Sequence, residues 1–164
     1  MFDMWKLQDF APGEGVRKGA GLETHDDSQW IDVPVPGDVH TALLAAGRIP
    51  DPFFGQNEGA CAWVQDREWW YRLRFVAPPE PPHEDERLLL VFHGLDTFAT
   101  VYLNGHELGA TDNMFRAFTF DVTRALRPGA PNTLAVRFDP HLEHVKDKDT
   151  RTRHVDHHEP RVAM

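Results

Sequence analysis

The sequence predicts an all-β domain, an antiparallel β-sandwich of the jelly-roll type. Three observations predict it: several short segments alternate apolar with polar residues, Gly and Pro separate them, and only one helical segment is indicated. The length of 164 residues suits a single domain with a sizeable core.

The alternation is clearest in residues 68–76, EWWYRLRFV. Side chains of a strand point to opposite faces in turn. One face therefore carries Trp69, Tyr71, Leu73 and Phe75, and the other Trp70, Arg72 and Arg74. The same period recurs in residues 99–103, 118–122 and 134–138, whereas residues 87–93 are almost continuously apolar. That run predicts a strand covered on both faces.

The connections between these segments carry turn residues. Asn104-Gly105 predicts a type I′ hairpin, because both residues tolerate positive φ. RPGAPN at 127–132 predicts another turn, and the Pro-rich, acidic stretch 77–86 a solvated connection. A short helix is expected near residues 38–46, capped by Asp38 and ended by Gly47.

Composition limits the class of partner. The net charge is −9, and scattered Lys and Arg do not form the basic cluster that nucleic acid or an acidic membrane surface requires. We find no apolar run long enough to cross a bilayer and no secretory signal pattern, so the cytoplasm is the expected location. Cys61 is the only cysteine, which excludes an internal disulfide and favours a buried apolar role.

Two stretches resemble a known family. WIDVPVPGDVHTALLAAGRIPDPFFGQNE at 30–58, followed by Trp63 and EWWYRLRF at 68–75, resembles the N-terminal domain of β-mannosidases of glycoside hydrolase family 2. Residues 91–138 resemble the galactose-binding-like sandwich found across that family. The resemblance extends from Trp5 to about Phe138, and the loop GRIPDPFFGQNE is what favours a mannosidase.

The resemblance implies an activity that this chain cannot carry out alone. Enzymes of the family release terminal non-reducing β-mannose by a retaining mechanism that uses two carboxyl groups and needs no cofactor. In the family both groups are glutamates of a (β/α)8 barrel further along the chain. The 164 residues contain no barrel and end before the family's Gly-Trp-Asp-Trp-Gly-Pro segment. We therefore expect no catalytic residue here, a truncated or partial gene product, and an inactive isolated chain.

The loop before residue 68 holds the candidate sugar-binding residues. Asp51, Asn57 and Glu58 offer hydrogen-bonding groups for hydroxyls, and Trp63 offers an apolar face. The resemblance implies that this loop leans toward the active-site mouth, with Asn57 and Glu58 the stronger candidates. The alternative is a loop made rigid by its prolines, whose polar groups satisfy its own backbone.

The aromatic run at 69–71 cannot form one stacking platform, because adjacent strand residues face opposite sides. We expect Trp69 and Tyr71 in the core and Trp70 against a neighbouring domain that is absent here.

The last residues differ in composition from the rest. The alternation predicts a sandwich over 1–140 and a charged, His-rich tail over 141–164, the start of a truncated continuation. HVDHHE at 154–159 is a conceivable metal cluster, but a solvated tail without metal is the favoured interpretation. Two rival functions stay open, a stand-alone carbohydrate-binding module and a non-catalytic interaction domain.

Overall fold

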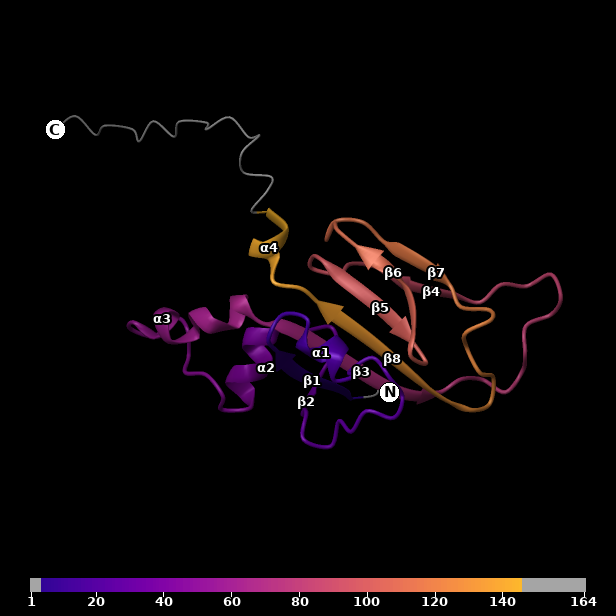
Figure 1. Ribbon diagram of the computed structural model, residues 1–164, viewed down its shortest axis with the longest axis horizontal. Helices are drawn as coiled ribbons and strands as arrows, with labels where there is room; N and C mark the ends of the chain where they lie inside the picture. Colours follow the sequence, from indigo (N-terminus) through magenta and orange to yellow (C-terminus); the bar gives the residue numbers. More distant parts are fainter. Residues whose placement is uncertain (1–3, 146–164) are drawn as a thin grey trace, which may run out of the picture.

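The computed structural model describes residues 4–145, and it is a sandwich of two antiparallel sheets (Figure 1). The larger sheet has the order β2-β1-β3-β8-β5-β6, and the smaller one pairs β4 with β7. This confirms the predicted fold class. The strands are β1 (Trp5–Phe10), β2 (Ile31–Val33), β3 (Glu68–Val76), β4 (Leu89–Phe92), β5 (Ala99–Leu103), β6 (His106–Thr111), β7 (Phe118–Asp121) and β8 (Pro131–Phe138).

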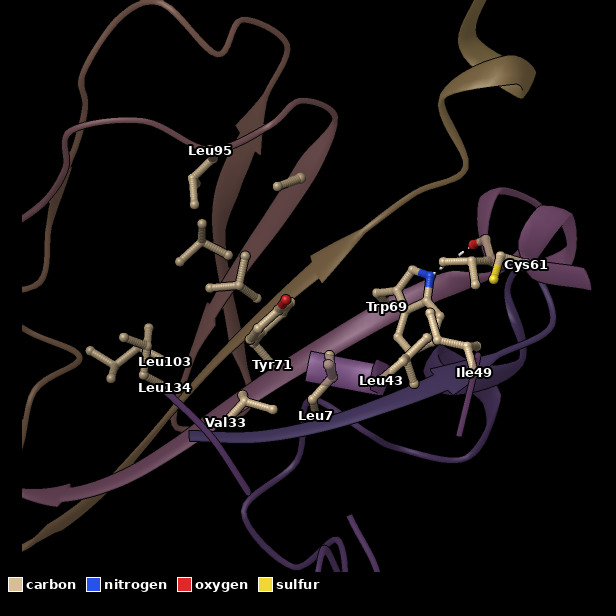
Figure 2. Packing of buried hydrophobic residues seen from close by; sticks show 14 of the residues in the cluster. Leu7, Val33, Leu43, Ile49, Cys61, Trp69, Tyr71, Leu95, Leu103 and Leu134 are labelled. Atoms are coloured by element: carbon tan, nitrogen blue, oxygen red, sulfur yellow. Dashed lines mark hydrogen bonds between the residues drawn. The ribbon is translucent and has the colours of Figure 1, made fainter. Parts of the chain in front are cut away.

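The centre of the large sheet is the pair β3–β8, in which Trp69 lies opposite Phe138 and Val76 opposite Pro131. The inward face of β3 is the one that the sequence predicted. Trp69 and Tyr71 belong to the main hydrophobic core, and Leu73 and Phe75 pack against it. Figure 2 shows Trp69 among side chains from outside the sheet, those of Leu43, Ile49 and Cys61.

The opposite face of β3 is covered by residues 10–30 of the same chain. Trp70 is 1% exposed and packs with Phe10, Ala20 and Trp30. The expectation that Trp70 packs against an absent domain is therefore wrong. The N-terminal segment has no periodic pattern that could predict this layer. It contains helix α1 (Glu14–Arg17).

Two buried charged side chains of β3 fix this layer. The carboxylate of Glu68 accepts hydrogen bonds from the backbone N–H groups of Gly13 and Gly15, both at 2.7 Å, and from Nε1 of Trp70 at 3.0 Å. Arg72 is fully buried, and its Nε donates to Asp27 Oδ2 at 3.0 Å. Both side chains replace their hydrogen bonds to water with hydrogen bonds to this segment. Such replacement makes the burial of a charged group tolerable.

The small sheet covers only part of the large one. Leu90, Phe92 and Phe120 face the core, while Leu89 is 56% and Val91 is 45% exposed. The prediction that residues 87–93 are covered on both faces is thus wrong for the described chain. Continuous apolarity indicates that both faces of a strand avoid water, but here the outer face has no covering layer among residues 4–145.

The predicted turns and helix are present. Asn104 and Gly105 have φ of 53° and 81°, as a type I′ hairpin requires, and Gly129 has φ of 64° in the 127–132 turn. Helix α2 (Val39–Ala45) has Asp38 as its N-cap, and the chain leaves it at Gly47, whose φ is 67°. Three other short helical elements were not predicted: α1, α3 (Asn57–Cys61) and η1 (Ala62–Asp66). Helix α4 (His141–Val145) begins where the predicted tail begins, a segment for which a short helix was one of the options.

We predict that Gly15→Ala destabilises the protein by about 3 kcal/mol. Two costs sum to this value, the overpacking of the layer and the loss of a buried hydrogen bond. A Cβ at residue 15 lies 2.2 Å from Nε1 of Trp70 and 2.6 Å from Oε1 of Glu68. Urea unfolding measures the change. Gly59→Ala in α3 is the matched control, because its Cβ meets nothing within 4 Å. Equal stability of the Gly15 variant and wild type contradicts the packing described here.

Candidate functional site

The candidate site is a cleft at one end of the sandwich, with a volume of about 530 Å³. Its floor is the inner face of the large sheet, formed by Trp69 and Tyr71 of β3 and Val136 and Phe138 of β8. Residues 35–40 before and in α2 line one side, and Phe92 at the end of β4 with residues 94–96 lines the other. The cleft is therefore apolar at its base and open between the two covering layers.

The rim of the cleft carries polar groups from distant parts of the sequence. Asp38, His40, Arg67, Asp139 and His141 all line it. Arg67 is held by Asp9, with Nε 2.7 Å from Oδ2, and Asp139 is held by Arg137, with Oδ1 2.8 Å from Nε. These ion pairs fix rim side chains in position, although each is partly exposed and contributes little stability.

Two groups at the cleft have displaced pKa values, and both stay in their ordinary charge state near neutral pH. Burial raises the pKa of the Tyr71 hydroxyl to about 12, and nearby Asp38 adds to the effect. The backbone N–H of Thr41 is the main cause that lowers the pKa of Asp38 below its ordinary value of 3.8. Tyr71 is thus protonated and Asp38 ionised, so neither suits proton transfer at neutral pH.

The loop that holds the predicted sugar-binding residues lies beside this cleft. Asp51 Oδ1 accepts from the N–H of Phe53 at 3.0 Å, and Nδ2 of Asn57 donates to the carbonyl of Asp51 at 2.9 Å. Asn57 begins α3, where Glu58 follows and is exposed. Asp51 and Asn57 therefore serve the backbone of their own loop, as the structural alternative predicted for the polar groups.

Trp63 connects the loop to the wall of the cleft. Its ring lies 6.0 Å from that of Trp69 between centroids, and the side chain remains 38% exposed. Nε1 of Trp69 donates to the carbonyl of Val64 at 2.9 Å, the dashed line in Figure 2. Val64 itself lines the cleft. None of Asp51, Asn57, Glu58 or Trp63 lines the cleft; they stand outside it, on the adjoining surface.

Sequence reasoning missed the most exposed aromatic side chains of this end. Phe53 is 98% and Phe54 73% exposed on the loop, and Phe115 is 88% exposed next to the cleft residue Met114. Large apolar side chains that water surrounds are typical of a contact surface. The pair Phe53-Phe54, which follows Pro52 in a loop without strand alternation, was the available signal in the sequence.

The remaining sequence predictions concern Cys61 and the histidines. Cys61 is buried in the core, as predicted. In α4, His141 lines the cleft and the ring of His144 stacks on Phe98 at 4.2 Å. Residues 4–145 contain no cluster of three or more His, Cys, Asp or Glu side chains able to hold a metal ion. The 154–159 cluster lies outside the described residues.

These features define a β-sandwich with a cleft and several exposed aromatic side chains, and comparison with known proteins identifies the family. Residues 21–163 match the family described as glycosyl hydrolase 2 galactose-binding domain-like. The chain belongs to this family. No helix within residues 4–145 combines the length and apolarity needed to cross a membrane.

Curated relatives are named as β-mannosidases. The chain is 42% identical over 141 residues to β-mannosidase B of Emericella nidulans, which covers 85% of this chain and 16% of that protein. It is 45% identical over 114 residues to β-mannosidase B of Thermothelomyces thermophilus, covering 69% of this chain and 13% of that protein. The chain thus spans about a sixth of the length of these relatives.

Solved structures share the fold. The β-D-mannosidase of Dictyoglomus thermophilum superposes with a TM-score of 0.70 at 32% identity, covering 91% of this chain and 16% of that one. A β-glucuronidase of Ruminococcus gnavus superposes with a TM-score of 0.60 at 22% identity over 85% of this chain, which shows the common sandwich alone.

We predict that Asp38→Ala costs about 1 kcal/mol of stability at neutral pH, because the N-cap of α2 is lost. The depressed pKa of Asp38 means that wild type holds this advantage above about pH 4 and loses it as pH falls through the folded pKa. Urea unfolding at pH 7 and about pH 3 measures the difference. Asp38→Asn, which still caps but does not titrate, is the control. A pH-independent gap between wild type and the alanine variant contradicts this account.

Proposed function

We propose that this chain is the N-terminal accessory domain of a β-mannosidase-like retaining glycoside hydrolase, which hydrolyses terminal non-reducing β-D-mannose residues. One observation carries the proposal: the relatives named β-mannosidase are about 40% identical to the chain and about five times as long. The accessory role follows because a match to about a sixth of each relative leaves room for a catalytic part elsewhere. The reaction itself needs no cofactor.

The chemistry of the described residues supports a non-catalytic role. A retaining glycosidase needs one carboxyl group with a raised pKa as the acid and a second as the nucleophile. Asp38 has a lowered pKa, and Asp51 and Glu58 lie on an exposed loop outside the cleft. We assign both catalytic carboxyl groups to the part of the enzyme that lies outside this chain.

The loop 51–63 is the part of this domain that we assign to the sugar pocket. Glu58 is free to accept hydrogen bonds from sugar hydroxyls, and Trp63 offers a partly exposed ring. Asn57 has its Nδ2 committed to the carbonyl of Asp51, which leaves its Oδ1 as the acceptor for a hydroxyl. Asp51 then acts as a support, because its side chain and carbonyl hold the loop in shape.

The exposed aromatic groups orient the domain. Phe53 and Phe54 lie on the same loop as the sugar-binding candidates, and Phe115 directly follows the cleft residue Met114. Covering such groups is favourable by about 25 cal/mol per Å² of apolar surface. We therefore place this end of the sandwich against the catalytic part, which brings the loop 51–63 to the mouth of the sugar pocket.

A second candidate is a stand-alone carbohydrate-binding module, because the cleft presents the aromatic rings of Trp5, Trp69 and Tyr71. Calorimetric titration of the chain with mannose and manno-oligosaccharides separates the two. Millimolar or tighter binding by the chain alone favours the module. The third candidate is a non-catalytic interaction domain. Co-purification of the chain with a separately encoded catalytic subunit supports this candidate. For each reading we propose the cytoplasm as the location.

We predict that the longer gene product hydrolyses p-nitrophenyl β-mannoside and that the 164-residue chain does not. In the longer protein, Asn57→Ala and Glu58→Ala are each expected to raise KM about tenfold, the loss of one hydrogen bond to the sugar. Steady-state kinetics measure both constants.

Glu107→Ala is the control for these variants, because Glu107 is exposed on β6 and does not line the cleft. If KM is unchanged in both loop variants, the loop is not part of the sugar pocket. Hydrolysis by the 164-residue chain alone overturns the accessory role.

A further inference from the structure

The hairpin between β5 and β6 contains a chemically reactive pair of residues, because Asn104 is the only asparagine of the chain that glycine follows. In a flexible chain the backbone N of such a glycine attacks Cγ of the asparagine, since glycine has no side chain to obstruct the approach. The N–Cγ bond forms and the Cγ–Nδ2 bond breaks. Nδ2 leaves as ammonia with the proton of the attacking N–H. Water then opens the cyclic succinimide to aspartate or isoaspartate.

The fold holds the atoms that this reaction must displace. Asn104 is 5% exposed, and its Nδ2 donates to the carbonyl of Ala125 and to Oδ1 of Asn132, both at 2.8 Å. Its Oδ1 accepts from the N–H of Thr133 at 2.9 Å. Attack makes the planar Cγ tetrahedral and releases Nδ2, so the reaction must break these hydrogen bonds in a place where little water replaces them. The native hairpin therefore resists deamidation.

The partner Asn132 cannot adapt to a carboxylate at residue 104. Its Oδ1 also accepts from the N–H of Arg127 at 2.9 Å, and its Nδ2 donates to the carbonyls of Arg127 and Ala130 at 2.9 and 2.8 Å. A flipped amide at Asn132 exchanges donor for acceptor and loses all of these bonds. Aspartate at residue 104 thus sets a buried negative charge against acceptors that have no proton to offer.

The turn itself has no room for isoaspartate. Asn104 and Gly105 form a two-residue loop that fixes Leu103 opposite His106. Isoaspartate carries the main chain through Cβ and Cγ, which lengthens this loop by a carbon atom and disturbs the register. The tip is also covered, since a Cβ at residue 105 lies 3.3 Å from Cδ2 of Leu22. Both products of deamidation are therefore incompatible with the native hairpin.

We propose that Asn104 is a deamidation site that the native fold shields, and that its modification prevents the chain from refolding. Unfolding exposes the Asn104-Gly105 pair, and water is the only co-reactant. A chain that stays unfolded for longer than the reaction takes is then lost to the native state, which makes unfolding irreversible. The inference goes beyond the proposed function and does not depend on it, because the residues that carry it lie within the described domain.

Mass spectrometry of the peptide that contains residue 104 tests the shielding. The chain is incubated in mildly alkaline buffer with and without urea, and the replacement of the side-chain NH2 by OH is followed with time. We expect deamidation of Asn104 to be at least roughly tenfold slower in the folded chain, because it requires opening of the hairpin. The synthetic peptide Tyr102–Leu108 in the same two solutions gives the effect of urea alone, by which the rates are corrected.

Equal corrected rates in the folded and the unfolded chain overturn the proposal. Faster deamidation of Asn57, Asn113 or Asn132 than of Asn104 in urea also overturns it. When urea is removed and the folded and unfolded fractions are separated by size-exclusion chromatography, we expect the modified chains in the unfolded fraction. Modified chains in the folded fraction contradict the block on refolding.

The variant Asn104→Asp reproduces the aspartate product and tests its effect on stability. We expect its folding equilibrium constant in urea titrations to fall about a hundredfold or more. The matched control is Asn113→Asp, because Asn113 is exposed and its Oδ1 accepts from the N–H of Phe115 at 2.8 Å, a bond that a carboxylate keeps. An Asn104→Asp variant as stable as wild type overturns the proposal. If this variant does not fold at all, the expectation is met in its stronger form, and the deamidation rates of the wild-type chain remain a separate test.

Discussion

The fold depends on one constraint: the first five residues of strand β3, Glu68–Arg72, are buried on both faces of the strand by two different layers. On the sandwich side Trp69 and Tyr71 enter the main core, and on the other side Trp70 and Arg72 lie under residues 10–30. A strand in this position excludes water from both faces, which is uncommon in an antiparallel sheet. Every other element is placed relative to it, since β1 and β8 pair with its two edges.

The second layer is unusual because charged groups hold it together. Burial lowers the pKa of Arg72, and the carboxylate of Asp27 opposes that shift. Nη1 of Arg72 also donates to the carbonyl of Leu22 at 2.9 Å, and the guanidinium lies 5.7 Å from the ring of Trp30. A buried ion pair adds little net stability, but removing one partner leaves an expensive unpaired charge. The pair thus specifies where the N-terminal segment lies.

Local signals predicted the elements whose structure is set locally. The alternation at 68–76, the Asn104-Gly105 turn and the Asp38 cap each depend on neighbours in sequence, and each is present. The strands β1 and β2 were not predicted, because their burial depends on pairing with each other and with β3. The partner of Trp70 was missed for the same reason.

The candidate site shows the same division between local and distant causes. The loop was found because Asp51, Asn57 and Glu58 are concentrated in a few residues. The cleft was not, because its lining combines residues from both ends of the described chain, such as Trp5 and His141. No local sequence pattern indicates that residues so far apart in the chain lie close together in the fold. The resemblance to a family supplied what composition could not, the expectation that the chemistry lies in another part of the enzyme.

The pairing of β3 with β8 has a consequence for biosynthesis. It joins Trp69 to Phe138, so the two central strands meet only after most of the described chain has left the ribosome. Until then the nascent polypeptide exposes an apolar strand with an unpaired edge. Chaperones can bind this edge, and neighbouring nascent chains can associate through it. Because β8 is central in the sheet and follows every other strand of residues 4–145, this part of the domain completes its sheet late in synthesis.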